Sequence, residues 1–247
     1  MSSSILILFV VTFFSGCIVY LMPKWKGENF NLTLIFAGSY LFGITIIHVL
    51  PELFKYQASN EFIGGMIMAG FFLQWILEYF TAGVEHGHVH LHKHDQKHSL
   101  VSSVSLMVAL CFHAFLEGTL LAHPITLHEH NPSASLLLGI TAHKIPASFA
   151  LMSVLTCHYS SKVKPMILLI IFSLASPLGL IISENLGESK IISENMFLIL
   201  FALVSGSFLK ISTTIFFESA PEHKSNLTKI IVSVAAALLA LLADFIF

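Results

Sequence analysis

The sequence predicts an all-α integral membrane protein with eight transmembrane helices. Of its 247 residues, 55% are hydrophobic and only 11% are charged, whereas a soluble domain has about 25% charged residues. Its apolar runs are long enough for helices that cross a bilayer, which takes about 20 residues each, and too long for the strands of about 10 residues that build membrane barrels. A helix also satisfies its own backbone hydrogen bonds in lipid. Eight crossings use about 160 residues, so we expect one transmembrane domain over residues 1–247.

The expected spans are placed by the apolar runs and the polar segments between them. In chain order they cover residues 4–22, 31–54, 62–82, 100–123, 134–157, 165–183, 195–217 and 230–247. The first run has no basic segment before it and no A-x-A-like site after it, so we expect a span and not a secretory signal. Glycines within the spans indicate close helix packing, namely Gly64, Gly65, Gly70, Gly139 and Gly206. The 22 phenylalanines are expected to face lipid or to fill the space between helices.

Lysine placement predicts the orientation. When the loops are taken in alternation, one set holds Lys24, Lys26, Lys93, Lys97, Lys162, Lys164, Lys224 and Lys229, and the opposite set holds Lys55 and Lys190. Cytoplasmic loops carry an excess of basic residues, so we expect the first set in the cytosol and both termini on the extracellular or luminal side. All 12 basic residues are lysines, which leaves no arginine clamp for phosphate and argues against nucleic acid as a partner.

The loop at about residues 85–98 carries a run of alternating histidines. They are His86, His88, His90, His92, His94 and His98. Imidazoles on a flexible strand suit a metal such as zinc, and the predicted orientation places this loop in the cytosol. We expect it to accept metal after release or to sense it, with a solvated polar loop as the alternative.

Ionisable side chains in the fourth and fifth spans form the strongest candidate site. His113 and Glu117 are four residues apart and share a face of the fourth span. In the fifth span, His143 and Lys144 come shortly before Pro146, whose ring frees a backbone carbonyl. A single histidine in a span is usually a core residue, but a carboxylate in a bilayer is costly unless it is paired or hydrated. Two imidazoles and a carboxylate, with positions left open for water, indicate a site for zinc or a similar divalent ion.

Further polar residues are second-tier candidates along a transport path. They are His48 and Glu52, four apart at the external end of the second span, and His128, Glu129 and His130 after the fourth span. Either group would raise the cation concentration at a pore mouth, and ordinary interfacial polarity is the alternative. Gln74 and Glu78 share a face of the third span, and Lys210 lies in the seventh. For these we expect an interhelical ion pair with a structural role.

Four segments resemble motifs of one family, the ZIP (Zrt/Irt-like) divalent-metal transporters. HAFLEG, from His113 to Gly118, is similar to the family's H-x-x-x-E-G signature in its fourth helix. ASPLG, which ends at Gly179, is similar to A-[ST]-P-L-G of the sixth helix, and SGSFL, which begins at Ser205, to S-G-T-F-L of the seventh. The second span ends in HVLPE at Glu52, similar to H-x-L-P-E. Eight spans, external termini and a histidine-rich loop also agree with the family pattern.

The resemblance implies uptake of a divalent metal into the cytosol through a site between the fourth and fifth helices. Zinc is the usual substrate, with iron, manganese or cadmium as alternatives, and no cofactor is implied. Carried over, His113, Glu117 and His143 are the primary ligands. Many members bridge two metals through carboxylates of the fifth helix, where this chain has Lys144 and Ala147. We hypothesise that the Lys144 ammonium takes the place of the second cation and pairs with Glu117.

Two other function classes stay open at this point. The chain has neither H-E-x-x-H nor G-x-S-x-G, so it is not expected to be an enzyme. A membrane-embedded zinc hydrolase with Glu117 as its base is one alternative, and a metal sensor that binds without transport is the other. For the oligomeric state, the resemblance implies at most a homodimer. We expect the plasma membrane as the location, with an organelle membrane as the alternative.

Overall fold

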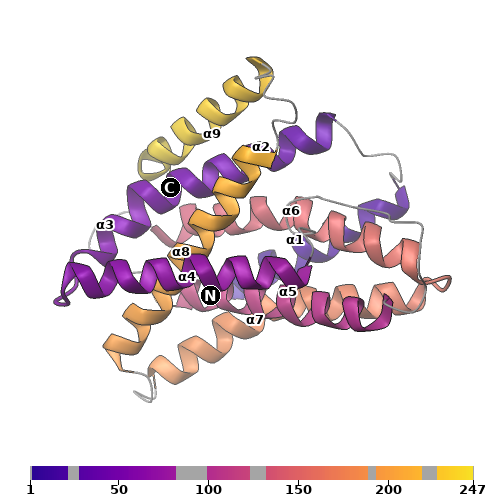
Figure 1. Ribbon diagram of the computed structural model, residues 1–247, viewed down its shortest axis with the longest axis horizontal. Coiled ribbons are helices and arrows are strands. Elements are labelled where there is room, and N and C mark those ends of the chain that lie inside the picture. The colour runs from indigo at the N-terminus through magenta and orange to yellow at the C-terminus, as the bar shows by residue number, and fades with distance from the viewer. Residues whose placement is uncertain are drawn as a thin grey trace.

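The computed structural model describes residues 2–21, 28–81, 99–122, 132–188, 193–218 and 227–246, and the regular structure in these segments is helical. The long helices are α1 (Ser2–Leu21), α2 (Glu28–Ile44), α4 (Asn60–Thr81), α5 (Ser99–Ala122), α6 (Pro132–His158), α7 (Val163–Glu188), α8 (Glu194–Glu218) and α9 (Leu227–Ile246). A π-helical turn, η1 (Thr45–Val49), and the short α3 (Leu50–Leu53) extend α2 (Figure 1).

Each predicted span corresponds to one helical segment, and the second span is built from α2, η1 and α3 in succession. Six segments are long and apolar enough to cross a membrane, namely Ser2–Leu21, Asn31–Leu53, Asn60–Phe80, Ala134–Thr156, Val163–Gly187 and Asn195–Phe216. Helices α5 and α9 contribute shorter apolar stretches, Met107–Ala122 and Leu227–Leu242. The chain is therefore a multi-pass membrane protein, while eight crossings and the orientation stay predictions.

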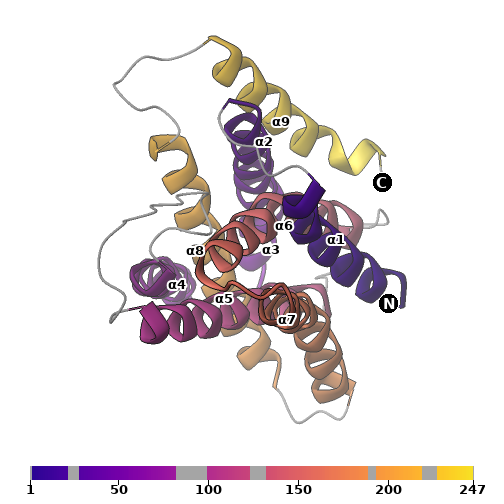
Figure 2. The same ribbon diagram turned by 90° about the vertical axis from the view of Figure 1, so that its right-hand side faces the viewer.

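The eight long helices pack in two groups of four. In the first group α5 packs closely against α7 and α1 against α6, and in the second α4 packs against α8 and α2 against α9. Figure 2 places α1, α6 and α7 on one side and α2, α8 and α9 on the other, with α4 beside α5. One apolar cluster, with Met152 and Leu169, lies within the first group, and a second cluster, with Tyr40 and Phe208, extends from the second group to Ile140 of α6. The two groups meet where α2 contacts α6 and α4 contacts α5.

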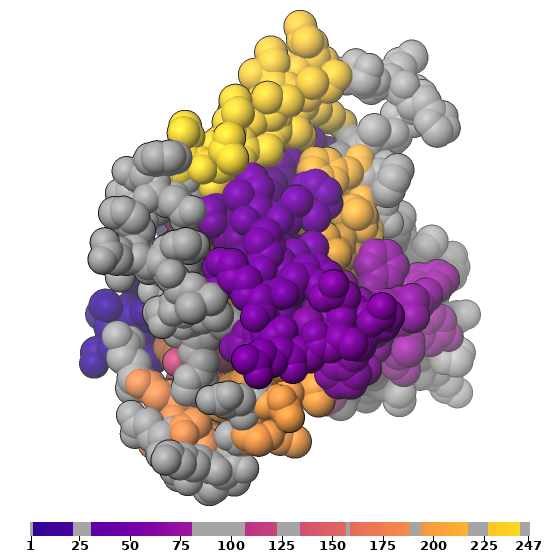
Figure 3. All heavy atoms as spheres, turned by 90° about the vertical axis from the view of Figure 1, so that its left-hand side faces the viewer, coloured from indigo at the N-terminus to yellow at the C-terminus, as the bar shows by residue number. Residues whose placement is uncertain are grey.

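The outer face of α4 is apolar and aromatic. Met68, Phe72, Trp75 and Tyr79 are exposed there. Figure 3 shows residues of α2 to α4, in purple, across the middle of one end of the molecule, with α9 in yellow above them. Exposed apolar side chains on a span are the surface that lipid covers, in agreement with the expected lipid-facing role of these aromatic residues.

Glycines bring α4 and α8 into backbone contact. A Cβ at Gly70 would lie 1.9 Å from the Leu203 carbonyl oxygen, and one at Gly206 would lie 1.9 Å from that of Ile67. The predicted close packing is confirmed at these two positions. It is wrong at Gly64 and Gly65, where a Cβ would have no neighbour within 4 Å, because these residues point away from α8 on the same helix.

An ion pair joins the same two helices. Lys210 of α8 contacts the Glu78 carboxylate of α4 and donates a hydrogen bond to the Thr214 hydroxyl one turn later. The Lys210 and Glu78 side chains are only 11% and 14% exposed. The predicted interhelical ion pair is therefore confirmed, and it supplements the backbone contact at the glycines.

Removal of one partner of this pair is expected to destabilise the protein more than removal of both. Lys210→Met removes the ammonium that faces the Glu78 carboxylate and should lower the free energy of unfolding by about 3 kcal/mol, the lower end for buried pairs because both side chains keep some exposure. The double variant Glu78→Gln, Lys210→Met should recover most of that loss. Denaturant unfolding of the purified protein in detergent measures both, and equal losses in the single and double variants would contradict the assignment.

Candidate metal centre

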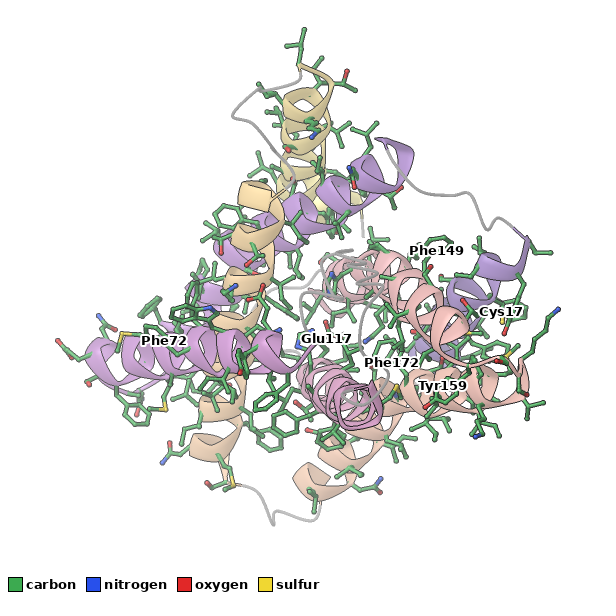
Figure 4. The ribbon with its side chains drawn as sticks, turned by 45° about the vertical axis from the view of Figure 1, so that its right-hand side comes forward. Cys17, Phe72, Glu117, Phe149, Tyr159 and Phe172 are labelled. Carbon is green, nitrogen blue, oxygen red and sulfur yellow. The ribbon has the colours of Figure 1, made fainter. Side chains whose placement is uncertain are left out.

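Helix α5 places an imidazole and a carboxylate side by side in the interior. His113 and Glu117 are one helical turn apart, and the Nε2 atom of His113 lies 3.1 Å from Oε1 of Glu117. Both residues are buried, Glu117 completely. Figure 4 shows Glu117 in the space between α5 and its neighbouring helices. The helical period explains this pair, since residues four apart face the same way.

Helix α6 brings the second imidazole to the same place. The His143 ring is buried, its centroid is 6.2 Å from that of His113, and the two rings are nearly perpendicular. One ligand atom from each of His113, Glu117 and His143 lies within 4.8 Å of the others. Among the described residues these form the one group of three histidine, cysteine or acidic side chains with such spacing. The structure therefore brings together the three ligands that the sequence analysis predicts.

The spacing of these atoms is compatible with zinc after side-chain rotation. Bonds from zinc to nitrogen and oxygen are about 2.0–2.2 Å, so two atoms that bind one ion at a tetrahedral angle lie about 3.4 Å apart. The three atoms, within 4.8 Å of one another, would have to approach each other by up to about 1.4 Å. Three protein ligands leave a fourth tetrahedral position for water, which is the arrangement of zinc sites that exchange a ligand.

Lys144 neutralises the carboxylate from across the helix interface. Its Nζ atom donates a hydrogen bond of 2.6 Å to Oε2 of Glu117, and its side chain is 3% exposed. The predicted pairing of these two residues is confirmed. The two carboxylate oxygens are thus divided, with Oε1 toward His113 and Oε2 toward the ammonium. With neutral imidazoles, the charges of the cluster cancel.

Helix α7 holds α5 in place behind this cluster. A Cβ at Gly118 would lie 2.0 Å from the Ser176 carbonyl oxygen, and one at Gly179 would lie 2.1 Å from that of Phe115. The Ser176 hydroxyl donates a 2.6 Å hydrogen bond to the carbonyl of Ala114. Because backbone meets backbone at these positions, α5 and α7 have little freedom to separate or slide.

Comparisons with known proteins place the chain in a family. The family model described as "ZIP Zinc transporter" matches residues 83–243, which is more than half of the chain. The chain belongs to the ZIP zinc transporter family. A similar protein is Protein zntD of Dictyostelium discoideum, which is 34% identical over 155 residues. The match covers 58% of this chain and 22% of zntD, so the chain spans about a fifth of its relative.

The ZIP family is a family of divalent metal transporters, not of enzymes. Membership therefore supports metal transport at the level of the family. The matched region includes α5, α6 and α7, and with them the buried cluster.

The second-tier residues have other surroundings. His48 lies in η1, and its Nε2 atom is 3.1 Å from the Ala240 carbonyl oxygen of α9. Glu52 in α3 forms a 2.5 Å ion pair with Lys55. The π-helical turn changes the register between His48 and Glu52, so the single α-helical face that the sequence analysis assumed for them is interrupted.

Other predicted residues lie outside the described part of the chain. These are His128, Glu129 and His130, and the histidine-rich loop with His86, His88, His90, His92, His94 and His98. Their roles stay predictions. The sequence analysis also missed a contact, since the Lys144 ammonium lies over the Phe172 ring, 5.3 Å from its centroid. No local signal distinguishes this residue among 22 phenylalanines.

The contact between α5 and α7 is expected to determine the geometry of the cluster. In Gly179→Ala the new methyl group meets a backbone carbonyl that cannot rotate away, so we expect a loss of about 2 kcal/mol in the free energy of unfolding, and weaker zinc binding. Gly64→Ala is the matched control, because the same change occurs there in open space and should leave stability equal or up to about 1 kcal/mol higher. Denaturant unfolding and calorimetric zinc titration in detergent measure both. Equal stability and equal zinc affinity of the two variants would refute the dependence of the cluster on the contact between α5 and α7.

Proposed function

We propose that this protein carries zinc, or a closely related divalent ion, across its membrane toward the cytosol through a site formed by His113, Glu117 and His143 between α5 and α6. The observation that carries the proposal is the burial of these three side chains with their ligand atoms within 4.8 Å of one another. Metal-ligating groups deep in a membrane protein mark ion pathways, because their cost in lipid is otherwise unexplained. Family membership supports the same activity.

The composition of the site favours a carrier over permanent metal storage. Three protein ligands leave coordination positions to water, so an ion is held without being enclosed. A carrier requires this, since a substrate site near the middle of the membrane must open alternately to each side. Neutral imidazole and carboxylate ligands suit zinc, with iron, manganese and cadmium as competitors.

The remaining features of the proposal follow from the sequence. The apolar runs support eight crossings, and the lysine distribution supports both termini outside and the histidine-rich loop in the cytosol. His48 and Glu52, with His128, Glu129 and His130, would concentrate cations at the external mouth, and the loop would receive the ion after release. We further propose the plasma membrane as the location and a homodimer as the assembly.

Lys144 serves in this proposal as a built-in cation. Many ZIP proteins hold a second metal through carboxylates of the fifth helix, and this chain has Lys144 and the buried Ala147 at those positions. The ammonium occupies Oε2 of Glu117 at 2.6 Å, which leaves one oxygen for a single ion on the His113 side. We therefore expect one metal at this site.

Zinc flux through the purified protein tests the function. In sealed proteoliposomes the intact chain should show saturable uptake of radioactive zinc. His113→Ala, Glu117→Ala and His143→Ala should each lower uptake by more than about 100-fold, since loss of even an outer partner of a metal ligand costs about 10–100-fold. Competition of iron, manganese and cadmium with zinc uptake ranks the preference of the protein for these ions.

Glu61→Gln is the matched control, because Glu61 is an exposed carboxylate at the start of α4 and its loss should leave uptake unchanged. Zinc binding without uptake by the intact chain would replace the transporter with a sensor. Bond cleavage in a substrate that depends on Glu117 would favour the hydrolase.

The stoichiometry of zinc binding tests the role of Lys144. Lys144→Asp removes the ammonium and adds a carboxylate next to Glu117, so bound zinc should rise from one to two ions per chain. Lys144→Met removes the charge without adding a ligand and should keep one. Metal analysis of the purified variants after dialysis against zinc measures the ratio, and a single ion in Lys144→Asp would contradict the built-in cation.

A further inference from the structure

The ammonium of Lys144 has two partners in the interior, and the second is an aromatic ring. Its Nζ atom lies 2.6 Å from Oε2 of Glu117 and 5.3 Å from the centroid of the Phe172 ring. A cation within about 6 Å of a ring face is attracted by the negative face of the aromatic quadrupole. Phe172 and the Lys144 side chain are each 3% exposed, so bulk solvent screens this contact little. Figure 4 shows Phe172 close to Glu117 in the interior of the molecule.

The packing of α7 fixes where this ring lies. Phe172 precedes Ser176 by one helical turn, so both side chains occupy the same side of α7. The Ser176 hydroxyl is bonded to the Ala114 carbonyl of α5 at 2.6 Å, and the glycine at position 179 holds the two backbones together one turn further along. The contacts that lock α7 to α5 therefore also set the position of the Phe172 ring relative to Glu117.

The contact between the Lys144 ammonium and the Phe172 ring matters more when an ion is bound at Glu117. In the empty cluster the ammonium is opposite a full carboxylate charge, and the two cancel. A divalent ion at Oε1 draws charge from the same carboxylate and repels the ammonium, because both cations then share one anion inside a medium of low dielectric constant. The Phe172 ring face is a second group in contact with the ammonium, and this contact matters more as the carboxylate is shared with the ion.

From this geometry we infer that Phe172 is a positioning residue of the transport site, which holds the Lys144 ammonium while Glu117 binds the ion and so sets the apparent affinity for zinc. The inference rests on the proposed function, and it adds a residue of α7 to a site otherwise built from α5 and α6. Phe172 acts through Lys144 and does not contact the ion. The effect of its ring therefore depends on the presence of the ammonium.

Kinetics of zinc uptake by the full chain in proteoliposomes test the inference. Phe172→Leu should raise KM by roughly 5- to 30-fold, the range to which a cation–π interaction of ordinary strength corresponds, with little change in maximal rate. In a Lys144→Met background the same substitution should leave KM unchanged. An equal rise in both backgrounds would assign Phe172 a packing role only and overturn the inference.

Fluorinated phenylalanines separate the electrostatic effect of the Phe172 ring from its effect on packing. Replacement of Phe172 by its mono-, di- and trifluorinated forms keeps the shape and weakens the negative ring face stepwise, so KM should rise with each fluorine. The same series at Phe201, a buried phenylalanine of α8, should be flat and is the control. A flat series at Phe172 overturns the inference even if Phe172→Leu fails to fold. Absence of uptake by the unsubstituted chain would instead refute the proposed function.

Discussion

A carboxylate enclosed by apolar helices needs a cation beside it, and the centre of this protein is arranged around that requirement. Glu117 is fully buried, and Lys144 meets it from the neighbouring helix at 2.6 Å. Loss of either charge alone would leave the other buried and uncompensated, so α5 and α6 must keep these two residues in reach of each other. His113 and His143 are carried on the same helices, one turn from Glu117 and directly before Lys144. The ion pair therefore also sets the distance between the two imidazoles.

The pair in turn depends on tight packing behind it. Helix α5 has α7 against one side, and backbone contacts at Gly118 and Gly179 leave no room for a side chain between them. Such contact between backbones is how helices associate where lipid gives no hydrophobic driving force. The result is a firm support for the carboxylate, and it presents the Phe172 ring to the ammonium at the same time. Small residues at the α5–α7 contact thus have a consequence at the charged cluster.

How far the sequence predicts this structure depends on whether a feature is local. One helical turn sets the spacing of His113 and Glu117, so the sequence alone predicts that pair. The approach of His143 depends on how two helices pack, and it was implied by the family resemblance and the cost of a buried carboxylate. The π-helical turn that contains His48 depends on the surrounding helices, and the apolar run there predicts one continuous helix. Gly64 and Gly70 look alike in sequence, but only Gly70 faces α8, because the rotation of a helix about its axis is a property of the whole bundle.

Among the described residues, two lysine–carboxylate pairs join one long helix to another, and their surroundings give them different chemistry. Lys210 and Glu78 have the Thr214 hydroxyl as a third partner, a weak ligand for a divalent ion, so this pair is suited to holding α4 and α8 together. Lys144 and Glu117 have two imidazoles beside the carboxylate, within 4.8 Å of one another and of Glu117, and imidazole is a strong ligand for zinc. In the proposed site an arriving ion would gain three ligands at Glu117 without displacing the lysine, since the ammonium contacts Oε2. The same charge pair is thus a structural link in one place and half of a candidate metal site in the other, and the neighbouring donor atoms make the difference.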